Sequence, residues 1–358
     1  MIKVGICLFQ NMRYAPFLKQ YEQILSEIPD CNYKVLYLDR KPLLNEPEDD
    51  IYSKVKWINV KSGVVYKIIN SFKYYKEAKQ YIKKEKFDFI IVLTTMPAVL
   101  LSGFLAKKYK GKYIVDVRDY TQEHFKIYKK LEKKVFGSSA MSVISSPGYT
   151  EFLPEFDYKV FHNNNINKNE TYPFEKAKNR PIVISNIGSI SYAEQWKKLI
   201  TLANGDERFE LNIYGNDGTG GEIPELVAKC NNPKIKIMAP FKPEQKKEIY
   251  LNSDIVFNCY GNDRPLVKYA LSNRLYDGAF YKKPLIVSPD TIMEKSSNGF
   301  AYALDLENIT NLDGLYQWYT NLDEDKYNEF AETLLDETSL ENEKTISEIK
   351  RLIKEHKK

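Results

Sequence analysis

The chain alternates short apolar runs with longer stretches in which hydrophobic residues recur every three or four positions. The first two are an apolar run at Lys3–Phe9 and an amphipathic stretch at Pro16–Ile28. Runs of the first kind predict β-strands buried on both faces, and stretches of the second kind predict α-helices that bury one stripe. Strands that alternate with helices indicate βαβ units, and therefore a parallel sheet with helices on both faces.

The alternation occurs in both halves of the chain. The other predicted strands are Tyr33–Leu38, Phe87–Leu93, Lys112–Val117, Ala140–Ile144, Tyr158–Phe161, Ile182–Ile187, Phe209–Tyr214, Lys234–Met238, Ile255–Cys259 and Leu285–Ser288. The other predicted helices are Val64–Lys84, a stretch from Pro97, Phe125–Phe136, Ala193–Ala203, Ile223–Cys230, Pro243–Leu251, one that begins near Ser272, and most of Leu306–Lys358.

At 358 residues the chain is longer than one typical domain, and we predict two Rossmann-like, doubly wound α/β domains. Residues 1–165 form the first domain and residues 181–335 the second. Residues 166–180 lie in a polar segment and are predicted to be a linker, and residues 336–358 are predicted to be a charged helix. Parallel sheets bind ligands beyond the carboxyl ends of their strands, so the turns after the strands are the candidate site segments.

The composition, 43% hydrophobic and 28% charged, is that of a folded soluble protein. The four cysteines are far apart and the chain has three histidines, which argues against a zinc site. The acidic triplet Asp323–Asp325 opens a charged helix, where carboxylates favour the macrodipole, so no metal is predicted. The run Val4–Phe9 is too short for a secretory signal, and free thiols indicate a cytoplasmic protein.

Two segments bear on membrane contact. Phe89–Ala106 has nearly the length and hydrophobicity of a membrane span, but Pro97 predicts a strand followed by a helix instead. Residues 1–165 hold 27 Lys and Arg against 18 Asp and Glu, and much of the excess lies in Lys61–Lys86, where lysines alternate with aromatic and aliphatic residues. Such a helix either lies on the anionic inner face of the cell membrane or packs its apolar stripe inward beneath solvated lysines.

The segment Asn273–Pro289, NRLYDGAFYKKPLIVSP, joins a polar-faced helix directly to a short buried strand. Ser272 is a suitable N-cap, and Asn273, Arg274 and Asp277 then lie on one face of the helix. A cation at a helix N-terminus with a carboxylate one turn later suits a diphosphate followed by a ribose. An ordinary amphipathic helix on the surface is the alternative.

Three more strand-end turns precede this helix. The predicted strand Ile182–Ile187 ends in Gly188 and Ser189, where backbone amides can approach a phosphate closely. The turns YGNDG, which contains Tyr214 and Gly215, and APFK, which contains Phe241, could cradle a base against an aromatic ring. Each of these turns could instead be a plain connection.

In the first half, the strand that ends in VDVRDY places Arg118 and Asp119 in one turn, with His124 close behind. Charges clustered at a strand end indicate ligand binding or catalysis, although an Arg–Asp pair can also clip a loop. The first strand is followed by QNMRYAP, whose Asn11, Arg13 and Tyr14 are candidate acceptor contacts or a cap of the first helix.

Four segments of the second half resemble, in order and partly in identity, the retaining glycosyltransferases of family 4, the group 1 glycosyl transferases, which have the GT-B fold. They are SNIGS (Ser185–Ser189), LNIYG (Leu211–Gly215), YLNSDIVFNCY (Tyr250–Tyr260) and NRLYDGAFYKKPLIVS (Asn273–Ser288). The last two are the most specific, and the resemblance covers Arg180–Ser288.

The resemblance implies two domains that face each other across a cleft, with C-terminal helices that return to the first domain. It implies a hexosyl- or other glycosyltransferase that retains the anomeric configuration, takes a UDP- or GDP-sugar as co-substrate and needs no metal or other cofactor. Asp277 would bind the ribose, while Arg274 and the Gly188 turn would neutralise the diphosphate. Asp119, Arg118 or His124 would position the acceptor, a saccharide that is lipid-linked in the synthesis of a surface polysaccharide such as a capsule. No nucleic acid partner is expected.

The sequence departs from the family in two places. The family's paired glutamates would fall on Tyr269 and Asp277, so only the second carboxylate is present. The arginine expected after the glycine turn is replaced by the segment Ser189–Ser191, and Arg274, with Arg264 or Lys268, would have to supply the charge. A nucleotide-sugar epimerase or hydrolase of the same form, and a non-catalytic sugar or nucleotide binding module, remain as alternatives.

Overall fold

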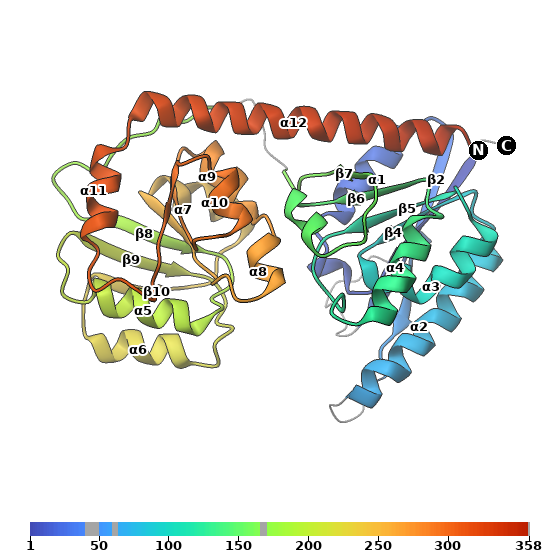
Figure 1. The fold of residues 1–358 in the computed structure, drawn as a ribbon, viewed down its shortest axis with the longest axis horizontal. Helices are drawn as coiled ribbons and strands as arrows, with labels where there is room; N and C mark the ends of the chain where they lie inside the picture. Colours follow the sequence, from blue (N-terminus) through green and yellow to red (C-terminus); the bar gives the residue numbers. More distant parts are fainter. Residues whose placement is uncertain (40–49, 59–63, 165–169, 357–358) are drawn as a thin grey trace. The chain divides into compact units, whose positions relative to one another are not determined.

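The computed structural model describes residues 1–39, 50–58, 64–164 and 170–356, without the side chains of residues 13, 64 and 65. The chain forms two compact units. The first comprises Met1–Asn163 and Leu340–Lys358, and the second comprises Asn164–Ser339. Each unit is described by itself below (Figure 1).

The first unit contains a seven-stranded sheet in the order β3-β2-β1-β4-β5-β6-β7, and the strand pairs are parallel. Its strands are β1 Ile2–Leu8, β2 Cys31–Asp39, β3 Tyr52–Lys56, β4 Phe89–Leu93, β5 Tyr113–Val117, β6 Met141–Ile144 and β7 Tyr158–Val160. Its helices are α1 Leu18–Ser26, α2 Val64–Glu85, α3 Thr95–Lys108 and α4 Lys126–Phe136, with the short 3-10 helices η1 Met12–Tyr14 and η2 Pro147–Glu151.

Helices cover both faces of this sheet. Helix α1 lies on one face together with the end of the long helix α12, Glu324–Lys354, which contributes Ile349 and Ile353 to the core. Helices α2, α3 and α4 lie on the other face (Figure 1). The central strands β4 and β5 are buried along their whole length, which is why their sequences are continuously apolar rather than alternating.

The second unit contains a six-stranded parallel sheet in the order β10-β9-β8-β11-β12-β13. Its strands are β8 Ile182–Ile187, β9 Phe209–Tyr214, β10 Ile235–Met238, β11 Ile255–Asn258, β12 Leu285–Val287 and β13 Ala301–Ala303. Its helices are α5 Ala193–Ala203, α6 Glu222–Cys230, α7 Lys246–Leu251, α8 Pro265–Tyr269, α9 Asn273–Phe280, α10 Ile292–Ser296 and α11 Asp313–Asn321, with the 3-10 helix η3 Pro243–Gln245.

Two hydrophobic clusters cover this sheet. One packs Trp196 and Leu199 of α5 with α6 and α11, and the other packs Leu275 of α9 with α7 and α10. In this strand order β8 is flanked by β9 and β11, so connections leave it in opposite directions, and the carboxyl ends of β8 and β11 form the switch point where such sheets bind ligands. The prediction of two Rossmann-like, doubly wound α/β units is confirmed.

Several local predictions need correction. Strands β3 and β13 were not predicted: both lie at sheet edges, and the half-buried β13 has only three residues, so neither gives an apolar run. The predicted helix Pro243–Leu251 is divided into η3 and α7, and the segment before α11 is not helical. The apolar segment Phe89–Ala106 is the strand β4 followed by α3, as predicted. No helix within the described residues is long and apolar enough to cross a membrane.

Candidate functional site

Two glycine turns lie together where β8 and β9 end. Gly188 and Gly215 have φ angles of +134° and +139°, which residues with side chains rarely adopt. A Cβ atom on Gly215 would lie 1.8 Å from the carbonyl oxygen of Gly188, so glycine is required for this close approach. Asn186 holds the two turns together, because its Nδ2 donates to the carbonyl oxygens of Gly188 and Tyr214, each at 2.9 Å.

In the turn after β8, the backbone amides of Gly188 and Ser189 differ in their hydrogen bonding. The N–H of Gly188 donates to the carbonyl oxygen of Tyr214 at 3.2 Å. The N–H of Ser189, whose side chain is exposed, has no hydrogen-bond partner in the described part of the chain. Both residues were predicted to bind the donor, and the geometry leaves the Ser189 amide as the one available to an anion.

Arg274 lies directly beneath these turns. Its side chain is buried, and its Nε donates to the carbonyl oxygen of Ile187 at 3.0 Å while its Nη1 donates to that of Phe257 at 3.0 Å and to the hydroxyl of Tyr260. A Cβ atom on Gly188 would lie 3.0 Å from Nη2, which has no hydrogen-bond partner among the described residues. No described carboxylate forms an ion pair with this guanidinium, which places a positive charge at the carboxyl ends of β8 and β11.

The start of α9 is capped as predicted. The hydroxyl of Ser272 accepts the N–H of Arg274 at 3.3 Å, and its carbonyl oxygen accepts the N–H of Leu275 at 3.0 Å. Asn273, the third predicted residue of this face, is exposed. In the first turn of α9, Asn273 is therefore the exposed residue, while Arg274, Leu275 and Tyr276 are buried and the Arg274 side chain lies beneath the sheet edge.

Asp277 is held by two residues of α7. Lys246 Nζ donates to its Oδ1 at 2.6 Å, and the Tyr250 hydroxyl donates to its Oδ2 at 3.3 Å. Burial raises the pKa of the Asp277 carboxyl, and the charge of Lys246 acts in the opposite direction. The carboxylate is thus fixed in place one helical turn from Arg274, and Lys246 is a cation of this edge that the sequence pattern did not predict.

The predicted base-binding rings also belong to this edge. Tyr214 and Phe241 are partly buried and pack against the cluster that contains Ile187 and Leu275. The structure therefore brings together Gly188, Ser189, Tyr214, Gly215, Phe241, Arg274 and Asp277 at the carboxyl ends of β8, β9 and β10, with Asn273 at the start of α9.

A pocket of about 600 Å³ opens beside them. Its walls come from the turns after β8, β11, β12 and β13. The ring centroids of Tyr192 and Tyr260 are 4.9 Å apart, the Arg264 guanidinium lies 5.3 Å from the centre of the Tyr192 ring, and Ser288 Oγ accepts the N–H of Gly261 at 2.9 Å. The two tyrosines were missed by sequence reasoning because they lie 68 residues apart and only the sheet brings their turns together.

In the first unit, Arg118 is buried and paired. Its Nε donates to Asp116 Oδ2 at 2.8 Å, its Nη1 donates to the Phe161 carbonyl oxygen at 3.3 Å, and its guanidinium lies between the rings of Phe17 and Phe161. This arrangement is the loop clip that the sequence left open as the alternative to catalysis. Arg118 was also a candidate acceptor contact, and here its guanidinium is turned toward the interior of the unit.

Asp119 and His124 lie at the surface of the same edge. Desolvation by the surrounding protein raises the pKa of Asp119 to about 6, Glu123 adds to the shift, and Arg118 opposes it. The side chain is nevertheless exposed, so water screens part of this effect. His124 is exposed, and its ring centroid lies 3.9 Å from that of Phe125. Both side chains are accessible to a ligand.

The turn after β1 has one buried and one exposed candidate. Asn11 is buried, and its Nδ2 donates to Asp39 Oδ1 at 3.2 Å, which ties the ends of β1 and β2 together. Tyr14 is exposed on η1. The side chain of Arg13 lies outside the described residues. Of the described side chains among these three predicted residues, that of Tyr14 faces solvent at the carboxyl edge of the sheet.

No protein-family model and no curated protein matches the chain. Solved structures do match over nearly its whole length. Sucrose-phosphate synthase from Thermosynechococcus elongatus matches with a TM-score of 0.71 at 10% identity, covering 99% of each chain. The lipopolysaccharide outer core galactosyltransferase WaaB matches with a TM-score of 0.61 at 12% identity, covering 96% of this chain and 99% of that one.

A UDP-N-acetylglucosamine 2-epimerase also matches, with a TM-score of 0.58 at 10% identity, covering 93% of this chain and 91% of that one. The chain has the GT-B fold. At these identities the likeness concerns the fold alone, because one fold can carry many different chemistries.

Proposed function

We propose that this chain is a glycosyltransferase that moves a sugar from a nucleotide diphosphate sugar to a saccharide acceptor. One observation carries the proposal: the buried Arg274 guanidinium, without a carboxylate partner among the described residues, lies beneath two glycine turns at the switch point of the second sheet. A cation held by three protein acceptors cannot move to meet a ligand, so it is preorganised for an anion that arrives at the turn.

The site supplies separate contacts for the parts of a nucleotide sugar. Nη2 of Arg274 and the amide of Ser189 would bind the diphosphate, Asp277 with Lys246 the ribose, and Tyr214 or Phe241 the base. The leaving diphosphate gains negative charge as the bond to the sugar breaks, so a fixed cation and amide lower the barrier to transfer. In a retaining reaction the leaving phosphate would itself accept the proton of the acceptor hydroxyl, without a metal or a further cofactor.

Asp119, with its raised pKa, and His124 are the proposed acceptor-side residues of the first unit, and Tyr14 offers an exposed ring at the same sheet edge. A carboxylate or an imidazole can accept a hydrogen bond from a sugar hydroxyl and so orient or deprotonate it. Asn11 and Arg118 are proposed to position this edge from within, since both are buried and hydrogen-bonded.

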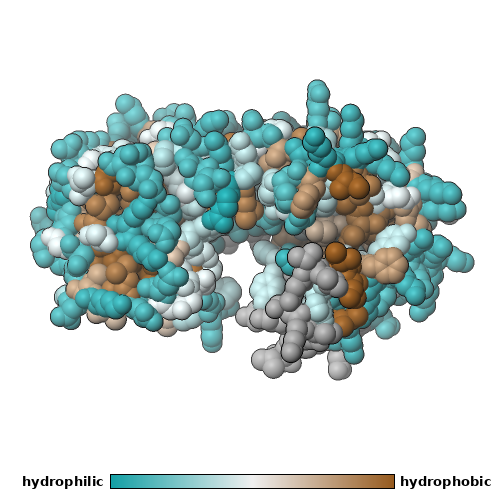
Figure 2. All heavy atoms as spheres, turned by 60° about the horizontal axis from the view of Figure 1, so that its bottom comes forward, coloured by the Kyte–Doolittle hydropathy of each residue, from teal (hydrophilic) through white to brown (hydrophobic). Residues whose placement is uncertain are grey.

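The surface of helix α2 is the observation in favour of a lipid-linked acceptor, such as one used in the synthesis of a surface polysaccharide. Its side chains Ile68, Ile69 and Phe72 are exposed, although apolar residues of this size are usually buried. Lys67 and Lys76 are exposed on the same helix, and Figure 2 shows hydrophobic residues gathered on the first unit in the view that brings the start of α2 forward. Apolar residues beside lysines suit the surface of an anionic membrane.

Replacement of Ile68, Ile69 and Phe72 by serine should abolish flotation with anionic liposomes and leave transfer to a water-soluble acceptor unchanged. The same replacement at the exposed Phe125 and Ile127 of α4 is the matched control. If the α2 variant floats as the wild type does, or if the wild type does not float, docking through α2 is wrong.

The function is tested by incubating the protein with a panel of UDP- and GDP-sugars, with and without saccharide acceptors, and following both nucleotide release and sugar product. A transferase releases nucleotide only with an acceptor, a hydrolase releases it without one, an epimerase changes the sugar without release, and a binding module does none of these. Arg274→Ala should lower turnover by about 100-fold or more, because a preorganised donor to the leaving group is lost.

The control is Arg208→Ala, which removes an arginine of the same unit that is paired with Asp206 and Asp313. Circular dichroism of both variants shows whether each retains its fold. Undiminished sugar transfer by a folded Arg274→Ala variant would refute the assigned site.

A further inference from the structure

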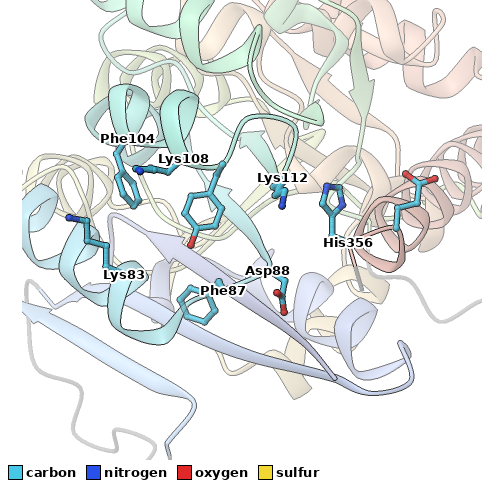
Figure 3. Close-up of a pocket in the computed structure, with 9 residues that line it drawn as sticks. Lys83, Phe87, Asp88, Phe104, Lys108, Lys112 and His356 are labelled. Atoms are coloured by element: carbon cyan, nitrogen blue, oxygen red, sulfur yellow. The ribbon is translucent and has the colours of Figure 1, made fainter. Parts of the chain in front are cut away.

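A second pocket, of about 590 Å³, opens at the opposite edge of the first sheet, where its strands begin. Its walls come from the ends of α2 and α3, the residues before β4 and β5, and the end of α12 (Figure 3). The turns that carry Asp119 and Asn11 follow the carboxyl ends of the strands, so this pocket is separate from the acceptor side proposed above. Its volume is that of a small-molecule site.

Three lysines give the pocket its charge. Lys83, Lys108 and Lys112 are exposed at its rim, and within the described residues none of their ammonium groups is paired with a carboxylate. Of the two carboxylates of the lining, Glu355 is paired with Arg351, whereas Asp88 accepts the backbone N–H of Lys3 at 3.0 Å and keeps its negative charge. The lining therefore holds three ammonium groups against one carboxylate without an ion pair among the described residues. Unpaired ammonium groups around a concave surface favour an anionic ligand, and lysine is a common partner of phosphate.

Lysines near helix C-termini often serve only to balance the helix dipole, and Lys83 and Lys108 lie at such positions. Lys112 does not, because it lies in the turn between α3 and β5. The dipole also gives no reason for the aromatic walls between the lysines. The combination of charge and rings is therefore the observation that favours a ligand.

Aromatic rings form the rest of the lining. Phe87 and Phe104 are buried and Tyr109 is half-buried, so the rings are fixed by packing rather than free in solvent. His356 closes the pocket from α12, with its Nδ1 2.9 Å from the carbonyl oxygen of Leu352, which leaves Nε2 for a ligand. Fixed rings beside cations suit a planar ring that carries a phosphate.

We propose that this pocket binds a small phosphate ester with a planar ring, of mononucleotide size. The lysines contact the phosphate, and the ring lies against Phe87, Phe104 or Tyr109. The site is independent of the donor site of the second unit, and it would let a free nucleotide bind the first unit while that donor site is empty or occupied.

The chain's three histidines provide a direct test. Histidine-labelled full-length protein is titrated with uridine 5′-monophosphate at low ionic strength, and the ring signals are followed by NMR, with His356→Gln assigning the signal of the pocket. We expect the His356 signal to shift saturably and the buried His162 to remain unchanged. Because the readout is local, it does not depend on whether the donor site or the proposed transfer reaction exists.

Charge reversal then tests the lysines. Lys108→Glu with Lys112→Glu should weaken the binding reported by His356 about tenfold or more, because two charge-assisted contacts become repulsive. Lys107→Glu with Lys110→Glu is the matched control: both residues are exposed, lie on the same segment and do not line the pocket. The control should bind as the wild type does.

Three results would overturn the proposal. The first is a His356 signal that does not move at saturating nucleotide, and the second is an equal loss of binding in the two charge-reversal variants. The third is binding of inorganic phosphate, or of phosphate-bearing lipid vesicles, as tight as that of the nucleotide, because the planar ring would then contribute nothing. Tyr109→Ala measured against Tyr109→Phe separates the contribution of the ring from that of the hydroxyl.

Discussion

Gly215→Ala is the substitution whose effect the structure defines most closely. The new Cβ atom would lie 1.8 Å from the carbonyl oxygen and 2.6 Å from the carbonyl carbon of Gly188, both of which are backbone atoms. The turn must therefore open, which we expect to cost about 1–3 kcal/mol, as other overpacked sites do. The φ angle of +139° adds strain of about 1–3 kcal/mol. The free energy of unfolding should fall by about 2–6 kcal/mol in total.

Gly205→Ala isolates the strain, because Gly205 also has a positive φ angle but a Cβ atom added there would meet no described atom within 4 Å beyond its chain neighbours. It should cost about 1–3 kcal/mol. Urea unfolding followed by tryptophan fluorescence measures both variants, since Trp196 and Trp318 lie in the second unit. Donor binding by Gly215→Ala should also weaken, as the Gly188 turn is displaced from Arg274. Equal destabilisation by the two substitutions would show that the close approach of the two turns is not what requires glycine.

Three further predictions concern charged groups. Asp277→Asn should raise the KM for the nucleotide sugar about tenfold with little change in kcat, because the charged partner of Lys246 is lost from a binding contact; an unchanged KM in steady-state kinetics would contradict this. Burial raises the pKa of Glu132 to about 9, above its value in the unfolded chain. The stability contributed by the protonated side chain is therefore fully present below about pH 4.5 and is lost as the pH rises toward 9. Glu132→Gln should stabilise the protein more at pH 8 than at pH 5 in urea unfolding, and a pH-independent difference would refute this prediction. Arg118→Leu should cost about 3–5 kcal/mol, since it leaves the buried Asp116 unpaired, and Arg118→Leu combined with Asp116→Leu should recover much of this loss.

The features that depend on neighbours in sequence were predictable. Strands β8 and β9 and helix α5 have the bounds expected from their apolar patterns, and Ser272 caps α9 as its residue type suggested. Of the four edge strands, β7 and β10 were predicted and β3 and β13 were missed; β3 shows little burial beyond Val55. The hydrophobic pattern of a segment reflects which of its residues are buried, so a strand with few buried residues shows only a weak pattern.

The role of each predicted site residue depended on contacts that are distant in the chain. Arg274 was predicted to neutralise a diphosphate, and carbonyl oxygens of two strands take up its Nε and Nη1. Asp277 was predicted to bind a ribose, and Lys246 holds its carboxylate from another helix. In the first unit, Asn11 turns to Asp39 rather than to solvent.

The sequence by itself determined the parallel α/β architecture and the turns at which ligands could bind, because hydrophobic periodicity and glycine or capping positions act over a few residues. Only the tertiary structure decided which polar groups at those turns remain available. Arg274 and the Ser189 amide became the proposed centre of the donor site, and lysines from α2, α3 and the turn before β5 met at one pocket. Hydrogen bonds and charges are satisfied by whichever partners the fold brings close, and that proximity is a property of the packed sheets rather than of any one segment.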